Sequence, residues 1–230
     1  MIKIKLPLLI EANLHLGHSK SKWNPKMAPY IYTKSKGNFY IIDLIQSIAL
    51  LRRALNKVYR LAKIKESIFL FVGTKPQASS LVKYAAKVCD SYYVNHHWSG
   101  GMLTNWNTLK TRLDYFEQLE EQERENQFDS LPKKEASSRR KKLLKFRKSL
   151  IGMKKMPKLP AAVIIIDQNK EIEAVRECQK LKIPIISILD TNCDPDLINY
   201  PIPGNDDSMS SIGLILDYLS TTIRIARLRN

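Results

Sequence analysis

Short apolar runs alternate with segments of helical periodicity along most of this chain, and this alternation restricts the fold more than any other feature of the sequence. The runs, rich in Val, Ile, Phe and Tyr, cover residues 39–42, 68–72, 92–94, 162–166 and 185–189. Strands that alternate with helices form a parallel sheet covered by helices on its two faces. The sequence therefore predicts a doubly wound α/β fold with a parallel sheet of about five strands.

The segments between the runs supply the helices. Apolar residues recur three and four positions apart over residues 44–61, which places them on one helix face. Residues 171–181 connect the last two runs as a crossover helix. We expect the last helix to begin near Asp207 or Ser208, whose side chains can cap it, and to continue to Ile223. Residues 201–207, with two prolines and a glycine, are interpreted as rigid turns leading into this helix.

Residues 95–161 carry no strand signal and are too many for an ordinary loop. Leu131 and Pro132 divide this stretch into two polar helical segments, each with a narrow apolar seam. We predict an α-helical, coiled-coil hairpin at residues 109–158, inserted between the two parts of the α/β domain, residues 1–108 and 159–230. The seam residues are Leu109, Leu113, Phe116 and Leu119 in the first arm and Leu143, Leu144, Phe146, Leu150 and Ile151 in the second.

The net charge of +16 is unevenly distributed. Residues 1–63 hold 12 Lys and Arg against 2 Asp and Glu, and residues 130–158 hold 12 against 1, whereas residues 113–129 hold 1 against 7. A positive surplus of this size attracts polyanions and gains affinity by releasing their counterions. Basicity needed only for solubility requires no such segregation. The pattern favours nucleic-acid binding by the N-terminal segment and by the second arm of the hairpin.

Cations and aromatic rings are interleaved in the N-terminal segment. Lys20, Lys22, Lys26, Lys34 and Lys36 stand among Trp23 and Tyr32. The cations can neutralise phosphates, and the rings can stack on unpaired bases. The alternative is a solvated loop whose aromatic rings fill the core. The segment alone leaves both interpretations open.

Two further groups of residues resemble a phosphate-binding loop and a catalytic carboxylate pair. Gly73, Thr74 and Lys75 follow a strand as a phosphate-binding loop would, but the leading glycine and the Ser or Thr after the lysine are missing. Lys75 instead remains available to an RNA phosphate. Asp167 and Asp190 end two strands, where enzymes of this architecture place catalytic groups. No nucleophile or base stands at a telling spacing, so capping of the following turns is the favoured interpretation.

His15 and His18 are three residues apart and could hold a divalent metal, with Asp190, Asp206 or Asp207 completing the site. A His-x-x-His pair without a nearby third ligand is weak evidence, so no metal is predicted. The cysteines Cys89, Cys178 and Cys193 are too widely spaced for a disulfide framework and indicate a reducing compartment. No apolar run is long enough to cross a bilayer. The opening residues turn polar too early for a secretory signal, so we expect none.

Taken in order, several motifs closely resemble one family, that of the second protein of the small ribosomal subunit. The resemblance covers residues 11–220, and no single motif is as specific as the ordered set. The motifs are LHLGH at 14–18, WNPKM at 23–27, IIDL at 41–44, FVGTK at 71–75, YVN at 93–95, Trp98, GGMLTN at 100–105, IP at 183–184, DTNCDP at 190–195 and IPGNDD at 202–207.

The resemblance implies a flavodoxin-like domain with a protruding helical hairpin that binds ribosomal RNA at the junction of the head and body of the small subunit. It also implies neighbouring small-subunit proteins as partners, with small-subunit protein one among them in bacteria. His97 and Ser99 depart from the arginine and the bulky residue usual in the family, which puts an RNA contact by that arginine in doubt. LTNW at 103–106 and LPK at 131–133 are most similar to plastid members.

We therefore predict a structural constituent of the small ribosomal subunit that supports translation and subunit assembly. It is expected to be ribosome-bound in the chloroplast stroma, with the bacterial cytoplasm as the alternative, and to have no catalytic activity, cofactor, small-molecule substrate or membrane contact. The rivals are a nucleotide or phosphotransfer enzyme using Asp167, Asp190 and Lys75, and a regulatory RNA-binding protein outside the ribosome. The predicted RNA-binding residues are His18, Lys20, Lys22, Trp23, Lys26, Tyr32, Lys34, Lys36, Lys75, His97, Trp98, Asn105, Arg139, Arg140 and Lys141.

Overall fold

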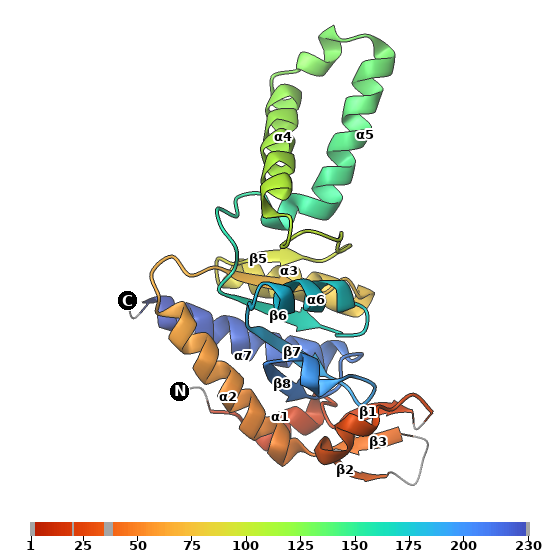
Figure 1. Cartoon of the computed structure of the whole chain (residues 1–230), viewed down its shortest axis with the longest axis vertical. Helices are drawn as coiled ribbons and strands as arrows, with labels where there is room; N and C mark the ends of the chain where they lie inside the picture. Colours follow the sequence, from red (N-terminus) through yellow and green to blue (C-terminus); the bar gives the residue numbers. More distant parts are fainter. Residues whose placement is uncertain (1–2, 20, 35–38, 229–230) are drawn as a thin grey trace.

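The computed structural model describes residues 3–19, 21–34 and 39–228, and its centre is a five-stranded parallel sheet (Figure 1). The strand order is β5-β4-β6-β7-β8. The predicted flavodoxin-like α/β fold is confirmed. The strands are β4 (Phe69–Val72), β5 (Tyr92–Val94), β6 (Ala162–Ile166), β7 (Ile185–Leu189) and β8 (Tyr200–Pro203).

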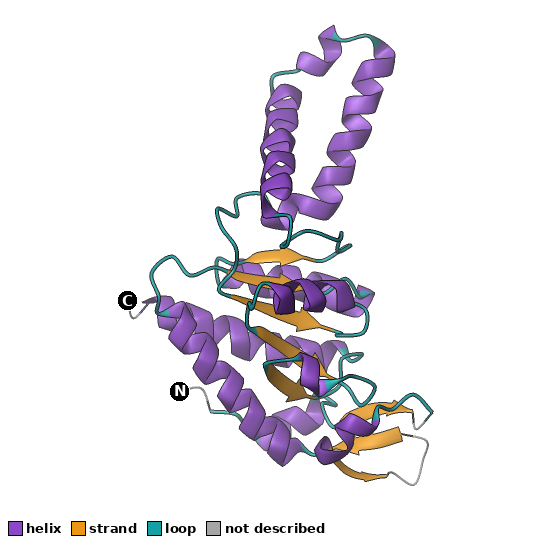
Figure 2. Cartoon of the chain, in the orientation of Figure 1, coloured by secondary structure: helices purple, strands orange, loops and turns teal. Residues whose placement is uncertain are grey.

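Helices cover the two faces of this sheet (Figure 2). Alternate side chains of each strand point to opposite faces, so Phe69 and Phe71 enter one apolar cluster while Leu70 and Val72 enter the other. The first cluster includes residues of α2, α3 and α7, and the second includes residues of α6 and the apolar seam of the hairpin. The helices are α1 (Leu6–Glu11), α2 (Leu44–Ala62), α3 (Pro76–Val88), α6 (Ile172–Lys180) and α7 (Met209–Leu228).

Two helix starts follow from local sequence. Asp43 caps α2, where its Oδ1 accepts hydrogen bonds from the backbone N–H groups of Ile45 and Gln46. Ser208, predicted as a cap, directly precedes α7 and its Oγ accepts from the backbone N–H of Ser211 at 3.5 Å.

The membership of the sheet differs from the prediction at one strand. Residues 39–42 form β3 (Phe39–Ile42), which belongs to a separate antiparallel sheet with β1 (Leu16–Ser19) and β2 (Ile31–Lys34) in the order β1-β3-β2. The fifth strand of the parallel sheet is β8, a stretch interpreted from sequence as turns. Pro201 and Pro203 were the reason for that interpretation, because proline is common in turns. β8 lies at the edge and pairs only with β7, so its prolines lose no ladder hydrogen bond on the open side.

The predicted helical hairpin is present. It consists of α4 (Trp106–Arg124), the 3-10 turn η2 (Gln127–Ser130), α5 (Lys133–Leu150) and the 3-10 turn η3 (Ile151–Met153). The seam on α4 is buried as expected, and so are Leu143 and Leu150 on α5. Leu144 and Ile151 were wrongly assigned to the seam, because they are 63% and 41% exposed. Leu144 is adjacent to Leu143 and so points about 100° away around the helix.

The hairpin and the small antiparallel sheet lie at opposite ends of the molecule's longest axis (Figure 1). The hairpin extends beyond β5, at one edge of the parallel sheet, while β1, β2 and β3 lie beyond β8 at the other. Two further 3-10 turns, η1 (Pro25–Tyr30) and η4 (Pro195–Leu197), lie at the β8 end. Among the described helices, none is both long and apolar enough to span a membrane.

Candidate functional site

The N-terminal basic segment runs from β1 through η1 to β2. Tyr32 is 73% exposed and Lys22 is exposed, so both are accessible to a partner. Trp23 is only partly exposed, and its ring packs against that of Tyr40 with centroids 5.1 Å apart. The ammonium of Lys26 is 2.7 Å from a carboxylate oxygen of Asp194 and 2.8 Å from one of Asp196.

Three lysines of this segment that are predicted to contact RNA have side chains that the structure does not describe. Lys20 and Lys36 fall outside the described residues, and so does the side chain of Lys34. For these lysines, and for the rest of the segment, RNA contact stays a prediction.

On the α5 arm of the hairpin, the arginines form ion pairs whereas the lysines are exposed. The guanidinium groups of α5 pair with acids: Arg139 with Glu135 at 2.8 Å, Arg140 with Asp129 at 2.6 Å, and Arg147 with Glu120 and Glu123 of α4. The lysines of α5 are all exposed, and Lys142 lies over the ring of Tyr115. These exposed lysines are Lys133, Lys134, Lys141, Lys142, Lys145 and Lys148.

Sequence reasoning missed the residue that fixes the base of the hairpin, Glu177 of α6. Its carboxylate is buried and accepts hydrogen bonds from the indole Nε1 of Trp98 at 2.9 Å and from the backbone N–H groups of Gly101, Leu103 and Thr104 at 2.8 to 2.9 Å. Burial alone would raise the pKa of Glu177, but these donors outweigh it and the pKa is lowered. Nothing in the local sequence of an amphipathic helix marks this glutamate.

The other predicted residues near this base are placed differently from one another. Trp98 is 5% exposed, so its indole has a structural hydrogen bond rather than an open face for stacking. His97 and Asn105 are exposed, and Oδ1 of Asn105 accepts a hydrogen bond from the hydroxyl of Thr108. RNA contact by these three residues stays a prediction.

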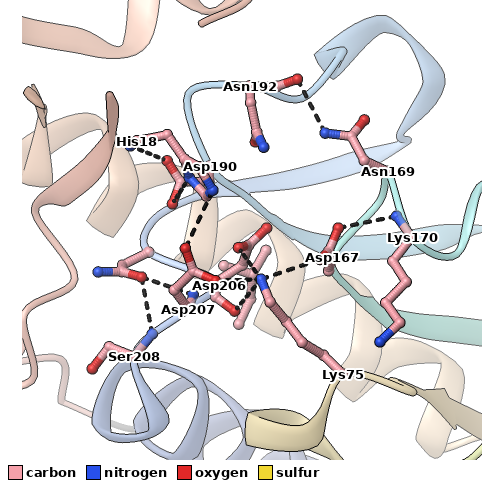
Figure 3. A network of polar contacts seen from close by, with 12 residues as sticks. His18, Lys75, Asp167, Asn169, Lys170, Asp190, Asn192, Asp206, Asp207 and Ser208 are labelled. Carbon is pink, nitrogen blue, oxygen red and sulfur yellow. Dashed lines mark hydrogen bonds and ion pairs between the residues drawn. The ribbon is translucent and has the colours of Figure 1, made fainter. Parts of the chain in front are cut away.

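A cluster of charged side chains fills the carboxyl edge of the parallel sheet (Figure 3). The ammonium of Lys75, which follows β4, lies 3.1 Å from Asp167, 3.0 Å from Asp206 and 2.5 Å from Asp207. The Lys75 side chain is 14% exposed. Because this side chain is largely buried and its ammonium is held by three carboxylates, an RNA phosphate would have to displace an acid to reach it. The predicted phosphate contact stays untested.

His18 brings the antiparallel sheet to the same edge. Its Nδ1 is 2.9 Å from Oδ2 of Asp190, and its Nε2 is 3.2 Å from Oδ2 of Asp207. Its backbone N–H donates to Oδ1 of Asp190 at 2.9 Å. The neighbouring Gly17 permits this approach, because a Cβ there would lie 2.6 Å from Cγ2 of Thr191. Asp190 accepts a hydrogen bond from the His18 imidazole, and this raises the pKa of His18 against the opposing effect of burial.

Asp206 carries the least compensated carboxylate of the cluster. It is 1% exposed, and burial together with the charges of Asp190 and Asp167 raises its pKa to about 7. Its Oδ1 meets Lys75, but its Oδ2 is buried and has no hydrogen-bond partner among the described residues.

Of the two histidines considered as metal ligands, only His18 joins this cluster. His18, Asp190, Asp206 and Asp207 can each place one ligand atom within 4.8 Å of the others. His15 does not take part, and it lies in the turn before β1 rather than on the strand.

The edge is poorly suited to the rival nucleotide chemistry. A phosphate would meet four carboxylates where a phosphate-binding loop offers backbone N–H groups. Gly73 serves close packing, since a Cβ there would lie 2.9 Å from Cγ2 of Val82 on α3. Asp167 and Asp190 cap the following turns, accepting from the backbone N–H groups of Lys170 and Thr191.

These features define a class of protein: a basic α/β protein that carries an inserted helical hairpin and presents exposed cations at its two ends. Comparison with known proteins specifies the family. The family model described as "Ribosomal protein S2" matches residues 9–226, nearly the whole chain.

The most similar relatives include small-subunit proteins from plastids and cyanobacteria. The chain is 56% identical over 228 residues to "Small ribosomal subunit protein uS2c" of Trieres chinensis, covering 99% of each chain. It is 55% identical over 227 residues to the protein of that name from Phaeodactylum tricornutum, covering 99% of this chain and all of the relative. It is 52% identical over 223 residues to "Small ribosomal subunit protein uS2" of a Synechococcus strain, covering 97% of this chain and 84% of the relative.

The chain belongs to the ribosomal protein S2 family. The resemblance found in the sequence is thereby confirmed, and with it the structural ribosomal role and the plastid type of the chain. Membership of a family of structural ribosomal proteins also decides against the enzyme.

Proposed function

We propose that this protein binds small-subunit ribosomal RNA as a two-ended electrostatic clamp and so supports assembly of the subunit and translation. One end is the N-terminal basic segment and the other is the α5 arm of the hairpin. The observation that carries the proposal is the separation of charge on α5, whose arginines pair with acids while its six lysines remain exposed. Lysines exposed along one helix suit phosphates, since each can release a counterion from RNA.

The distance between the two ends supports a clamp rather than a single patch. The hairpin and the antiparallel sheet lie at opposite ends of the longest axis (Figure 1), so one chain can contact two separate RNA segments. Two linked contacts strengthen each other, because the second is intramolecular once the first has formed. Loss of either end should therefore weaken binding by more than its own contacts alone would suggest.

Within the N-terminal end, the exposed residues are the strongest candidates. Lys22 and Tyr32 are accessible, the first to a phosphate and the second to a base. Trp23 packs on Tyr40 and thereby braces the segment. Lys26 is held by Asp194 and Asp196, so its contribution requires exchange of an acid for a phosphate.

RNA affinity measured across a series of salt concentrations tests this proposal. The logarithm of the binding constant should fall linearly with the logarithm of salt, by roughly 0.7 to 0.9 for each phosphate contacted. Lys141→Glu with Lys145→Glu should weaken binding and reduce the slope. A flat salt profile, or an unchanged affinity in this variant, would contradict the clamp.

A matched variant controls for the change in net charge. Lys83→Glu with Lys87→Glu alters two exposed lysines of α3 by the same total charge, far from the hairpin arm. We expect it to lower RNA affinity much less than the α5 variant. Equal effects would mean that overall charge, and no particular surface, drives binding.

The finer placement follows the family resemblance. We propose that the protein lies at the junction of the head and body of the small subunit, contacts neighbouring small-subunit proteins, with small-subunit protein one as a candidate partner, and resides on ribosomes of the plastid stroma. Sedimentation of stromal lysate tests this: the chain should cofractionate with small subunits. Recovery only in light fractions would instead support a regulatory RNA-binding protein outside the ribosome.

A further inference from the structure

We propose that the carboxyl edge of the sheet holds a divalent metal ion, Zn²⁺ by its ligand chemistry, bound by His18, Asp190, Asp206 and Asp207. The inference is independent of RNA binding. It joins residues of β1, the loop after β7 and the loop after β8, so the ion would attach the antiparallel sheet to the parallel one (Figure 3).

Geometry is the first argument. One ligand atom from each of the four residues lies within 4.8 Å of the others. Tetrahedral bonds of about 2.0 to 2.2 Å place ligand atoms roughly 3.4 Å apart, so side-chain shifts of about 1 Å would bring the four atoms around an ion. The residues are already held in place: the backbone N–H of His18 donates to Asp190, and Asn205 caps the turn at Asp207 by accepting from its N–H at 2.8 Å.

The second argument is an orphaned atom. Oδ2 of Asp206 is buried without a hydrogen-bond partner among residues 3–19, 21–34 and 39–228, and the Asp206 side chain is 1% exposed. A buried carboxylate oxygen without a donor is costly, since it has lost its water and gained nothing in return. A cation seated among the four residues would satisfy it directly.

Charge is the third argument. The cluster contains four carboxylates: those of Asp167, Asp206 and Asp207 lie around the ammonium of Lys75, and that of Asp190 lies beside His18. When all four are ionised, Lys75 and a protonated His18 leave two negative charges uncompensated, which agrees with the raised pKa of Asp206. Lys22 also acts on Asp207 from outside, but it is exposed to solvent. A divalent ion has the charge that balances the cluster.

The donor set selects the kind of metal. One imidazole nitrogen with carboxylate oxygens is a ligand set that Zn²⁺ accepts in tetrahedral geometry. Mg²⁺ prefers oxygen ligands alone, in octahedral geometry, and retains water. Lys75, which lies beside Asp206 and Asp207, orients both carboxylates from the side and acts as a positioning residue.

The test is calorimetric titration of the purified full chain with Zn²⁺ in RNA-free buffer, beside the variants His18→Gln and His15→Gln. We expect one Zn²⁺ per chain. Replacing a residue that only hydrogen-bonds to a metal ligand lowers metal affinity by about 10- to 100-fold. Replacing the ligand His18 itself should therefore lower the affinity for Zn²⁺ by at least about tenfold. His15→Gln is the matched control, a histidine three residues away outside the cluster, and should bind as the parent does.

A second measurement keeps the proposal testable if a variant folds poorly. Co²⁺ bound by the parent chain should show the strong visible absorption of tetrahedral coordination, and Asp206→Asn should lack it while circular dichroism reports an intact fold. Absence of Zn²⁺ binding, binding equal in His18→Gln and His15→Gln, or complete displacement of Zn²⁺ by excess Mg²⁺ would each overturn the assignment. Should Asp206→Asn unfold, the comparison of the two histidine variants decides alone.

Discussion

The sheet-edge cluster and the hairpin both combine many charged residues, but they are built in opposite ways. The side chains of the cluster come from distant parts of the chain, and all but that of Asp207 are largely buried: His18, Lys75, Asp167, Asp190, Asp206 and Asp207. In the hairpin, the pairs join neighbouring turns or facing arms, and most of their side chains are substantially exposed. Burial makes the first set energetically costly to disturb, whereas solvent screens the second.

The difference separates two uses of charge in one protein. Buried charges have few alternative partners, so they fix how loops and sheets meet. Exposed charges exchange partners easily, which suits a surface that must release its own ion pairs to bind a polyanion. The following predictions test this contrast, from the largest expected effect to the smallest.

Replacing the ammonium at the centre of the cluster should have the largest effect. Lys75→Met leaves Asp167, Asp206 and Asp207 facing one another without their shared cation. Breaking a buried ion pair by removing one partner costs roughly 3 to 5 kcal/mol. Urea denaturation without added metal should show a loss in this range. Lys170→Met, an exposed lysine on the adjacent turn, is the control, and similar losses in the two variants would contradict the contrast.

The base of the hairpin should behave as a buried site although the arms do not. Glu177→Gln keeps the shape of the side chain but removes the charge that Trp98, Gly101, Leu103 and Thr104 all donate to. A hydrogen bond to a charged group contributes about 1.5 to 3 kcal/mol, so we expect a loss of about 2 to 3 kcal/mol in unfolding free energy. Hydrogen exchange at the N–H groups of Leu103 and Thr104 should accelerate.

The exposed Glu173 lies one turn earlier on α6 and provides the control for that variant. Glu173→Gln should change stability by less than about 0.5 kcal/mol. If Glu173→Gln and Glu177→Gln lower the unfolding free energy equally, Glu177 does not anchor the hairpin.

The same two regions explain how far sequence reasoning could reach. The hairpin was predictable because its seam, its break at Leu131 and Pro132 and its segregated charge are all local patterns. Leu144 and Ile151 were misassigned only because the phase of a short seam is ambiguous by one residue. The strand β8 was missed because its prolines mimic a turn, and only its edge position makes them acceptable.

The buried charges were less accessible to such reasoning. His18, Asp190, Asp206 and Asp207 could be named as candidates, but their meeting depends on how the antiparallel sheet docks on the parallel one. Glu177 was not foreseen, since its partners are backbone N–H groups of a loop more than seventy positions away. Local periodicity contains no information on such contacts.

The pH dependence of stability should report on Glu177 with a smaller effect than its replacement. Its pKa is lower in the folded protein than its ordinary value of about 4.5. The unfolded chain therefore takes up the proton first as the pH falls, so the stabilisation present above pH 4.5 is lost as the pH drops through the folded pKa. The difference in unfolding free energy between the parent and Glu177→Gln should shrink below about pH 4.5. A constant difference across this window would show that the charge is not what the donors bind.

The smallest effect is expected for an ion pair between the arms. Arg147→Met removes the bonds to Glu120 and Glu123, while the methionine keeps much of the apolar stem and Lys154 remains bound to Glu120. Exposed pairs contribute about 0.2 to 1 kcal/mol, so the loss should stay below 1 kcal/mol and shrink further in high salt. Denaturation at two salt concentrations measures both effects. A salt-independent loss above 2 kcal/mol would mean that the arms are locked by a rigid network, and a rigid network could not release its arginines to RNA.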